Sequence, residues 1–187
     1  MTGIDLSGVD LSTETIRTER LVLRPFREDD VGAVFAACQD PDIQRWITAL
    51  PVPYTETHAR NFVRDVATGG RAAGRDLTVA IEANGVLIGS SGVHALRTHP
   101  LGPEIGYWLV PRARGRGYAT ETTHALAEWA LGLGAHRVHL VADVANPASQ
   151  AVARRAGFSL EGVLRSYLAY RDGTRGDAAL FGRLPED

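Results

Sequence analysis

The sequence contains no lysine, and all twenty of its basic residues are arginines in a chain of 187 residues. Without a lysine amine the chain cannot be a Schiff-base enzyme of the pyridoxal type. It also cannot hold a phosphate-binding loop of the G-x-x-x-x-G-K-[ST] kind, because that loop needs its lysine. The absence of one residue type therefore excludes two common chemistries.

Cysteine is nearly absent as well, since Cys38 is the single one. One cysteine excludes an intrachain disulfide and a cysteine-rich zinc or iron–sulfur site. No apolar run approaches the roughly 18 residues that span a bilayer, and residues 1–13 lack the charge and apolar stretch of a secretory signal. We therefore expect a cytoplasmic protein in a reducing compartment, with no membrane partner.

The chain has little excess charge of either sign, because its 20 basic and 22 acidic residues give a net charge of −2. A near-neutral chain does not favour general nucleic-acid binding, which usually requires a strongly basic surface. The length fits one domain. We expect a polar, flexible segment over residues 1–14, followed by one domain over residues 15–187.

The order of apolar runs and turn signals predicts a single-domain α/β fold, with a mixed, mostly antiparallel sheet flanked by helices. Asn84-Gly85 between two apolar runs predicts a hairpin, Asp40-Pro41 is expected to end a helix, and residues 68–74 are expected to be flexible. Expected strands lie at about 21–26, 77–81, 86–89, 105–110, 137–144, 162–170 and 177–183, and expected helices at about 28–39, 55–66, 118–131 and 147–156.

The most informative stretch is residues 110–120, V-P-R-A-R-G-R-G-Y-A-T, which follows a predicted strand and enters a predicted helix. Gly115 and Gly117 allow a ligand to approach the backbone closely. The free N–H groups and the dipole of a helix N-terminus attract anions. Arg112, Arg114 and Arg116 add forked donors for phosphate oxygens. This combination predicts a phosphate-bearing ligand.

Three other interpretations of this turn are weaker. A solvated basic turn would need no ligand. A dinucleotide fold would need G-x-G-x-x-G on its first βα unit, but the third glycine is replaced by Thr120 and the turn lies past mid-chain. RNA binding through the arginines would need an aromatic platform, and none lies near the turn.

The turn resembles the R-x-x-G-x-G/A motif of the GCN5-related N-acetyltransferase (GNAT) superfamily, with Arg112, Gly115 and Gly117 at the defining positions. A second block, from Asn146 to Phe158, resembles the family's N-x-x-[AS] helix ending in x-G-F. The resemblance runs from about residue 17 to the C-terminus. It is strongest to the branch of ribosomal-protein-alanine N-acetyltransferases (RimJ/RimL type).

The resemblance implies that acetyl-coenzyme A is the cosubstrate. Its pyrophosphate would bind the glycine turn, and its pantetheine arm would bind amides from a bulge in the preceding strand. The implied cofactor-binding residues are Trp108, Leu109, Val110, Arg112, Arg114, Gly115, Arg116, Gly117, Tyr118, Ala119, Thr120, Asn146 and Ser149.

The implied activity is that of an N-acetyltransferase, an acyltransferase of class EC 2.3.1 that moves acetyl directly to a primary amine. Such transfer needs a general base, donors to an oxyanion and a donor to the leaving thiolate. We expect Glu104 to be the base, because it would begin the strand that holds the thioester. The alternative is an exposed strand-end glutamate, and His94 and Tyr107 are further candidates for the base.

For the leaving group, many family members place a tyrosine seven residues after the asparagine, but this position is Ala153 here. We therefore expect Ser149 to donate to the sulfur, as in the ribosomal branch. The alternative is a serine bonded to backbone, and Asn146 could also cap this helix. The backbone N–H of Leu109 or Val110 would donate a hydrogen bond to the oxyanion. The reaction needs no metal.

The expected partners are acetyl-coenzyme A and an amine acceptor, with no nucleic acid and no membrane. The sequence leaves open whether the protein forms a homodimer and how long the transferred acyl chain is. The acceptor could be a protein N-terminus or a small-molecule amine. Trp46, Tyr54 and residues 98–102 are expected to line the acceptor side, although both aromatics could instead be core. Without lysine, self-acylation is expected only at the N-terminus or Cys38. A competing hypothesis is a non-catalytic acyl-coenzyme A sensor, which would need neither Glu104 nor Ser149.

Overall fold

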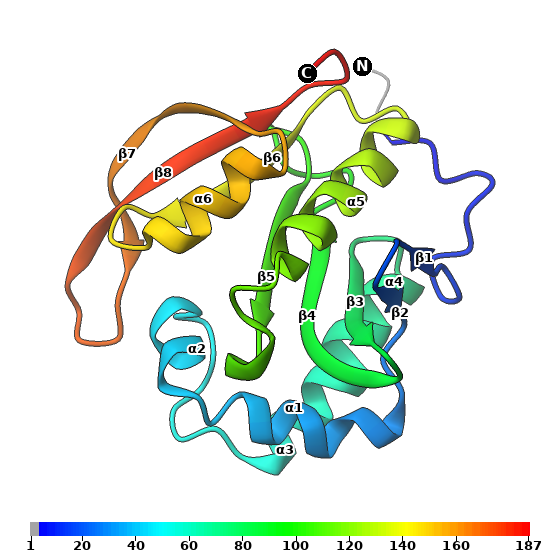
Figure 1. Ribbon diagram of the computed structural model, residues 1–187, viewed down its shortest axis with the longest axis vertical. Helices are drawn as coiled ribbons and strands as arrows, with labels where there is room; N and C mark the ends of the chain where they lie inside the picture. Colours follow the sequence, from blue (N-terminus) through cyan, green and yellow to red (C-terminus); the bar gives the residue numbers. More distant parts are fainter. Residues whose placement is uncertain (1–3) are drawn as a thin grey trace.

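One sheet of eight strands organises the computed structural model, which describes residues 4–187. The strand order is β1-β2-β3-β4-β5-β6-β8-β7 (Figure 1), and every neighbouring pair is antiparallel except β5 with β6. The predicted mixed, mostly antiparallel sheet is confirmed. The strands are β1 Ile16–Arg17, β2 Val22–Arg24, β3 Leu77–Ala83, β4 Val86–His94, β5 Glu104–Leu109, β6 Val138–Asp143, β7 Ser159–Ala169 and β8 Arg175–Arg183.

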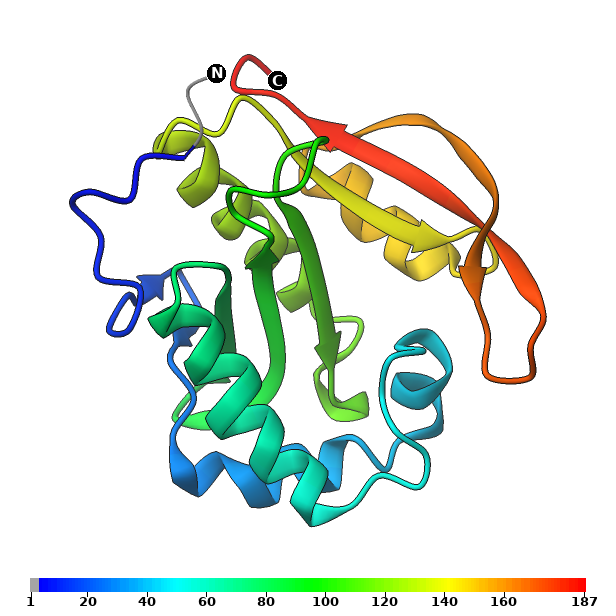
Figure 2. The same cartoon turned by 180° about the vertical axis from the view of Figure 1, so that it is seen from behind.

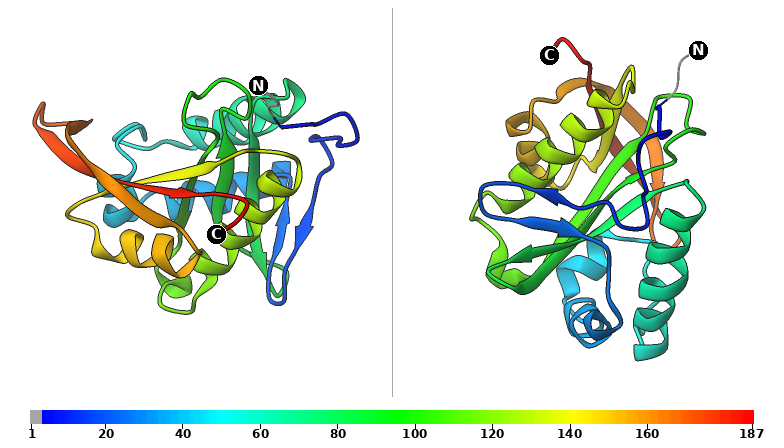
Figure 3. Two further views of the ribbon diagram at one scale, coloured as in Figure 1. Left: turned by 90° about the horizontal axis from the view of Figure 1, so that it is seen from above. Right: turned by 90° about the vertical axis from the view of Figure 1, so that its right-hand side faces the viewer.

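Helices cover both faces of this sheet. α5 and α6 lie on one face, and the run from α3 to α4 lies on the other (Figures 1 and 2; Figure 3, right). None of the helices in residues 4–187 is long and apolar enough to cross a membrane. The helical elements are η1 Glu28–Asp30, α1 Val31–Ala37, α2 Pro41–Trp46, α3 Glu56–Asn61, the π-helical η2 Phe62–Thr68, α4 Gly69–Ala72, η3 Pro111–Ala113, α5 Tyr118–Gly132 and α6 Pro147–Arg155.

Local turn and capping signals are confirmed where the chain reverses or a helix begins. Asn84 and Gly85 adopt φ of 51° and 76°, the left-handed pair that a two-residue hairpin turn requires between β3 and β4. The Asn146 side chain accepts a hydrogen bond from the N–H of Ser149 at 3.0 Å, so it caps α6, with Pro147 in the first turn.

In the first half of the chain, the predicted helix break at Asp40-Pro41 is confirmed, whereas a helix that begins there was not predicted and the expectation for residues 68–74 was wrong. Asp40-Pro41 follows the end of α1 but also begins α2, because the Asp40 carboxylate accepts from the N–H of Ile43 at 3.0 Å. The segment 68–74 is not a flexible loop over most of its length, because helical structure continues through Ala72. The first half therefore contains one more helix and a longer helical run than predicted.

Residues 4–14, part of the segment expected to be flexible, contact the domain. Ile4 and Leu11 are buried in the core. The Trp129 indole donates to the Glu14 carboxylate at 3.0 Å, and the buried Arg71 guanidinium donates to the Glu14 carbonyl at 2.6 Å. Burial lowers the pKa of Arg71 to about 10. The boundary at residue 15 stays a prediction, and residues 1–3 lie outside the described residues.

A buried ion cluster joins β2, η1 and β3. The Arg24 guanidinium makes two contacts with the Asp30 carboxylate, at 2.7 and 2.9 Å, and its Nε contacts Glu82 at 2.7 Å. The Arg24 and Asp30 side chains are only 7% and 8% exposed. Burial acts to raise the pKa of Asp30, but hydrogen bonds from Arg24 and the Arg27 N–H outweigh it and lower that pKa. The cluster therefore depends on every charge having its partner.

The sheet opens where its one parallel pair begins. The β5–β6 pairing is confined to Glu104 opposite His139, and the strands then diverge toward their C-terminal ends (Figure 2). On its other edge β5 stays paired with β4 along its whole length, from His94↔Glu104 to Gly89↔Leu109. One edge of β5 therefore leaves its backbone groups free to meet a ligand.

Candidate active site

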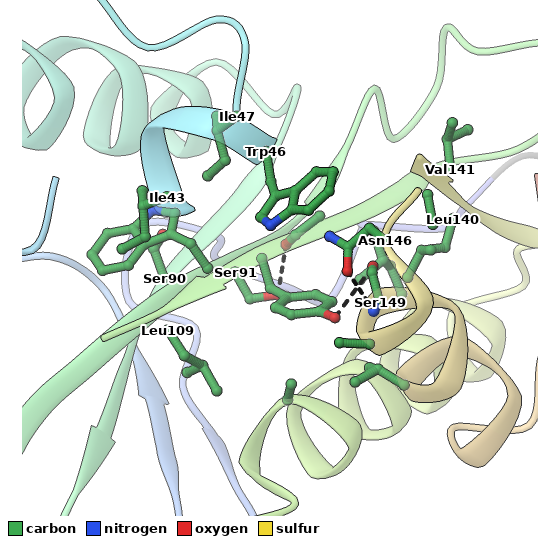
Figure 4. Close-up of a pocket in the computed structure, with 18 of the residues that line it drawn as sticks. Ile43, Trp46, Ile47, Ser90, Ser91, Leu109, Leu140, Val141, Asn146 and Ser149 are labelled. Carbon is green, nitrogen blue, oxygen red and sulfur yellow. Dashed lines mark hydrogen bonds between the residues drawn. The ribbon is translucent and has the colours of Figure 1, made fainter. Parts of the chain in front are cut away.

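A cavity of about 820 Å³ occupies the region where β5 and β6 separate. Its lining comes from α2 and the following loop, from β4, β5 and β6, from the glycine turn and from α6. Figure 4 shows Trp46 and Ile47, at the end of α2, on one side and Asn146 and Ser149, at the start of α6, on the other. The cavity thus brings together the two sequence blocks that were predicted to bind one ligand.

The glycine turn forms one wall of this cavity. Gly115 and Gly117 have φ of +72° and +79°, conformations that favour glycine, and Gly117 precedes the first turn of α5. The first intrahelical bond of α5 runs from the N–H of Glu121 to the Gly117 carbonyl at 3.0 Å. The N–H groups of residues 118–120 therefore have no intrahelical acceptor, and these residues line the cavity. These N–H groups lie at the positive end of the helix dipole, which is the geometry that the predicted anion site requires.

The three arginines of the turn have different surroundings. The Arg112 guanidinium donates to the Leu87 carbonyl at 3.3 Å, and Arg112 does not line the main cavity in the described structure. Arg114 forms ion pairs with Asp40 at 2.5 Å and Asp42 at 3.0 Å. The Arg116 side chain makes no hydrogen bond within residues 4–187. Arg116, like Arg112, does not line the cavity in the described structure, whereas Arg114 does. Phosphate binding by these three residues stays a prediction.

Two further arginines lie near this ligand site. Arg20 donates to the Arg116 carbonyl at 2.9 Å, stacks over the Tyr118 ring at 4.8 Å and pairs with Glu121 at 2.6 Å. Arg155, at the end of α6, lines the cavity. Sequence reasoning missed Arg20 because it is 96 residues from Arg116, and no local spacing signal connects the two.

The β5 backbone contradicts one implied feature. The register between β4 and β5 contains no shift, so the expected bulge is absent from the paired residues of this strand. The Val110 N–H donates to the Ile88 carbonyl at 2.9 Å. Since backbone groups alternate in an antiparallel pair, the Trp108 N–H also points to β4, whereas that of Leu109 points to the open edge. Of the three implied strand amides, only that of Leu109 faces the opening.

Side chains of β5 alternate between the two faces of the sheet. The Tyr107 hydroxyl reaches α6 and donates to Ser149 Oγ at 3.3 Å (Figure 4 marks the bond at Ser149). Burial raises the pKa of Tyr107, so its phenol remains a donor at neutral pH and is a poor general base. Because Ser149 Oγ accepts from Tyr107, its own hydrogen is free to point elsewhere.

Glu104 lies on the opposite face of β5, between two histidines in the sheet. His94 is its direct partner on β4, and His139 is its partner on β6, with Nε2 at 3.8 Å from a Glu104 carboxylate oxygen. Burial, and then the neighbouring His99, lower the pKa of His139 to about 4. His139 is therefore neutral at pH 7 and forms no salt bridge with Glu104. The Glu104 side chain is 40% exposed, which allows it to exchange a proton with water.

The cavity wall formed by α2, the following loop and η2 is mostly apolar, with Asp42 and Thr48 as its polar members. Trp46 lines it, as predicted, but Tyr54 is buried in the core and residues 98–102 do not line the cavity in the described structure, so both of those expectations were wrong. Cys38 is 1% exposed, and burial raises the pKa of its thiol to about 11, which disfavours acylation at Cys38. The apolar members of the wall are Ile43, Trp46, Ile47, Leu50, Phe62 and Val66.

Comparison with known families agrees with this architecture. The family model described as "Acetyltransferase (GNAT) domain" matches residues 20–159. This chain belongs to the GNAT acetyltransferase family. The match includes the glycine turn, the strand that carries Glu104 and Tyr107, and the helix that carries Ser149.

GNAT relatives extend over almost the whole chain. The N-acetyltransferase YoaA of Bacillus subtilis is 30% identical over 169 residues, covering 89% of this chain and 94% of YoaA. RimL, a ribosomal L7/L12 alpha-N-protein acetyltransferase solved with coenzyme A, is 25% identical with a TM-score of 0.81, covering 93% of this chain and 100% of that one. RimJ of Mycobacterium smegmatis, solved with a coenzyme A disulfide, is 25% identical with a TM-score of 0.80, and the match covers 93% of this chain and 87% of RimJ.

Proposed function

We propose that this GNAT protein transfers an acetyl group from acetyl-coenzyme A directly to a primary amine, at a protein N-terminus or on a small molecule. One observation carries the proposal. The cavity that begins at the free amides of the glycine turn passes between Ser149 on one face of the sheet and Glu104 on the other. A leaving-group donor and a base on opposite sides of one opening match the two proton movements of acyl transfer.

The chain's own groups fit coenzyme A. Glycine φ angles and free N–H groups at α5 suit a pyrophosphate, with Arg116, Arg155 and Arg20 as cationic neighbours. The proposed arm-binding group is the Asn146 amide, whose Oδ1 is used in capping while its Nδ2 makes no hydrogen bond within residues 4–187. Bound acetyl-coenzyme A would supply the activated acetyl group as a thioester. RimL and RimJ, both solved with coenzyme A forms, support this assignment.

Each catalytic role follows from position. Glu104 takes the proton of the amine, directly or through a water, because its carboxylate faces the cavity and is not neutralised by His139. The Leu109 N–H donates to the developing oxyanion, since it is the amide at the open edge of β5. Ser149 Oγ donates to the departing thiolate, and Tyr107 stabilises the serine by donating to it.

The mostly apolar wall supports an amine whose body carries no negative charge. Between Pro41 and Thr68, the residues that line the cavity include no basic side chain. An acceptor carboxylate or phosphate would find no cationic partner on this wall and would lose hydration without compensation. A peptide N-terminus meets the requirement, and the N-terminal acetyltransferase activity in the name of RimL points to the same class.

The activity is tested by incubating the purified protein with acetyl-coenzyme A and a panel of N-terminal peptides and small amines. We expect mass spectrometry to find acetylation of peptide α-amines, with coenzyme A released in equal amount. A panel made with peptides blocked at their N-termini is the matched control and should give no product. Tight binding of acetyl-coenzyme A without turnover on any amine would favour the sensor hypothesis instead.

The donor pair at α6 gives a second prediction. Ser149→Ala is expected to lower kcat about tenfold, the value of roughly one hydrogen bond in the transition state. Tyr107→Phe should lower kcat less, and the double variant should resemble Ser149→Ala because the two residues act in series. Calorimetric titration should find the Kd for coenzyme A nearly unchanged. A large loss of coenzyme A affinity in Ser149→Ala would assign the serine to cofactor binding.

A further inference from the structure

The short helix α2, Pro41–Trp46, forms the acceptor wall but contributes little to the core. Its only buried residue is Ile43, and both Ile43 and Trp46 line the cavity (Figure 4). A six-residue helix is too short to be stable by itself in water. Its position must therefore be set by contacts from other elements.

Arg114, on the glycine turn, makes the contact at the start of α2. Its Nη2 contacts the Asp40 carboxylate at 2.5 Å, and its Nη1 contacts Asp42 at 3.0 Å. Its Nε donates to the Leu109 carbonyl at 3.1 Å, at the open edge of β5. All three guanidinium nitrogens are thus in use, and two carboxylates neutralise the charge. Three of its five N–H donors are engaged, and the two carboxylates leave no net positive charge to attract a phosphate.

Arg171, in the turn between β7 and β8, holds the other end of α2. Its guanidinium donates to the Gln44 carbonyl, to the Ile47 carbonyl at 2.9 Å and to the Leu50 carbonyl at 2.6 Å. These carbonyls lie at and beyond the C-terminal end of α2, where helical carbonyls lack intrahelical partners. Figures 1 and 2 both show α2 between the glycine turn and the β7–β8 hairpin.

We propose that Arg114 is a positioning residue that couples the glycine turn to α2, so that coenzyme A bound at the turn fixes the acceptor wall. This inference rests on the proposed function. It replaces the expectation that Arg114 binds phosphate, and it makes acceptor recognition depend on cofactor binding. Coupling between two sites is reciprocal, so an acceptor seated against Trp46 also strengthens coenzyme A binding through the same side chain.

Hydrogen exchange followed by mass spectrometry tests the link with coenzyme A alone, before an acceptor is known. In the wild type, saturating coenzyme A should slow exchange both at residues 115–121 and at residues 41–50. In Arg114→Met the slowing at 115–121 should persist while that at 41–50 falls at least about fivefold. The Kd for coenzyme A should stay within about threefold of the wild type, because no phosphate contact is lost.

Arg116→Met is the matched control, since Arg116 lies two residues away and makes no ion pair within residues 4–187. It should weaken coenzyme A binding and, at saturation, keep the slowing at 41–50. Asp42→Asn removes one of the two ion pairs between Arg114 and the start of α2 without disturbing the Asp40 cap, and it should reproduce part of the Arg114→Met effect. Asp42→Asn can also replace Arg114→Met in this test if the Arg114→Met variant does not fold.

Two results would overturn the inference, and they differ in what they imply for the proposed function. In the first result, Arg114→Met lowers coenzyme A affinity more than about tenfold but keeps the slowing of hydrogen exchange at residues 41–50. This result identifies Arg114 as a phosphate ligand. In that case the proposed function stands. A wild type that binds no coenzyme A at all overturns both proposals.

Discussion

Glu104→Gln is expected to lower kcat about 100-fold or more, the usual contribution of a general base. Glutamine keeps the size of the side chain but cannot accept a proton. The acid limb of the wild-type pH–rate profile should be flattened in the variant. Coenzyme A affinity should not change, because Glu104 lies on the face of β5 opposite Tyr107 and Ser149. Steady-state kcat against pH and a coenzyme A titration measure the two effects.

His94→Gln is the control for this experiment. His94 is the direct cross-strand partner of Glu104 and also lines the cavity, with its ring 3.6 Å from Asp76. It is the remaining candidate for the base, since the pKa of Tyr107 is raised. An acid limb that survives Glu104→Gln and disappears in His94→Gln would move the general base to His94.

Arg24→Met is expected to destabilise the fold by about 3–5 kcal/mol, the range for breaking a buried ion pair from one side. The variant leaves the Asp30 carboxylate buried without its partner and removes the contact to Glu82. Methionine conserves most of the apolar stem, so the loss reports charge rather than volume. Urea unfolding at pH 7 measures the change in the free energy of unfolding.

Arg64→Met is the matched control, because Arg64 makes a similar two-point contact with Glu28 while both side chains are more than half exposed. Its loss should change stability far less, since water screens and replaces the exposed pair. The Arg24→Met penalty should also shrink on acidification. Asp30 has a lowered pKa when folded, so its stabilising contribution is present above its unfolded pKa and lost as pH falls through the folded value. Equal penalties for the two variants at pH 7 would contradict the burial argument.

The parts of the fold that are set by short-range chemistry were predictable from the sequence. The Asn84-Gly85 turn and the capped start of α6 at Asn146 each need only residues within a few positions. The extension of the helix through Gly69 and Gly70 could not be read this way, because two glycines disfavour helix locally. There the Arg71 guanidinium stabilises the helix by bonding to the Glu14 and Thr78 carbonyls, and Glu14 is 57 residues away.

Some features of the candidate site were likewise predictable from local sequence patterns, and others were not. The glycine turn, Glu104 and Ser149 stand in recognisable local patterns, and the structure brings them to one cavity. The interaction partner of each arginine was not predictable, because the sequence shows three arginines near a turn but not the groups that they contact. Arg114 pairs with carboxylates 72 and 74 residues away, and no local pattern indicates these contacts.

The burial of Cys38 has a practical consequence for all of these measurements. It is the sole cysteine, it is 1% exposed, and its pKa is about 11, so the folded enzyme offers almost no reactive thiolate. A chromogenic disulfide-exchange reagent added during turnover would therefore report released coenzyme A over a blank close to zero. In denaturant the same reagent would react as Cys38 becomes exposed, so one colour reaction could follow both catalysis and unfolding.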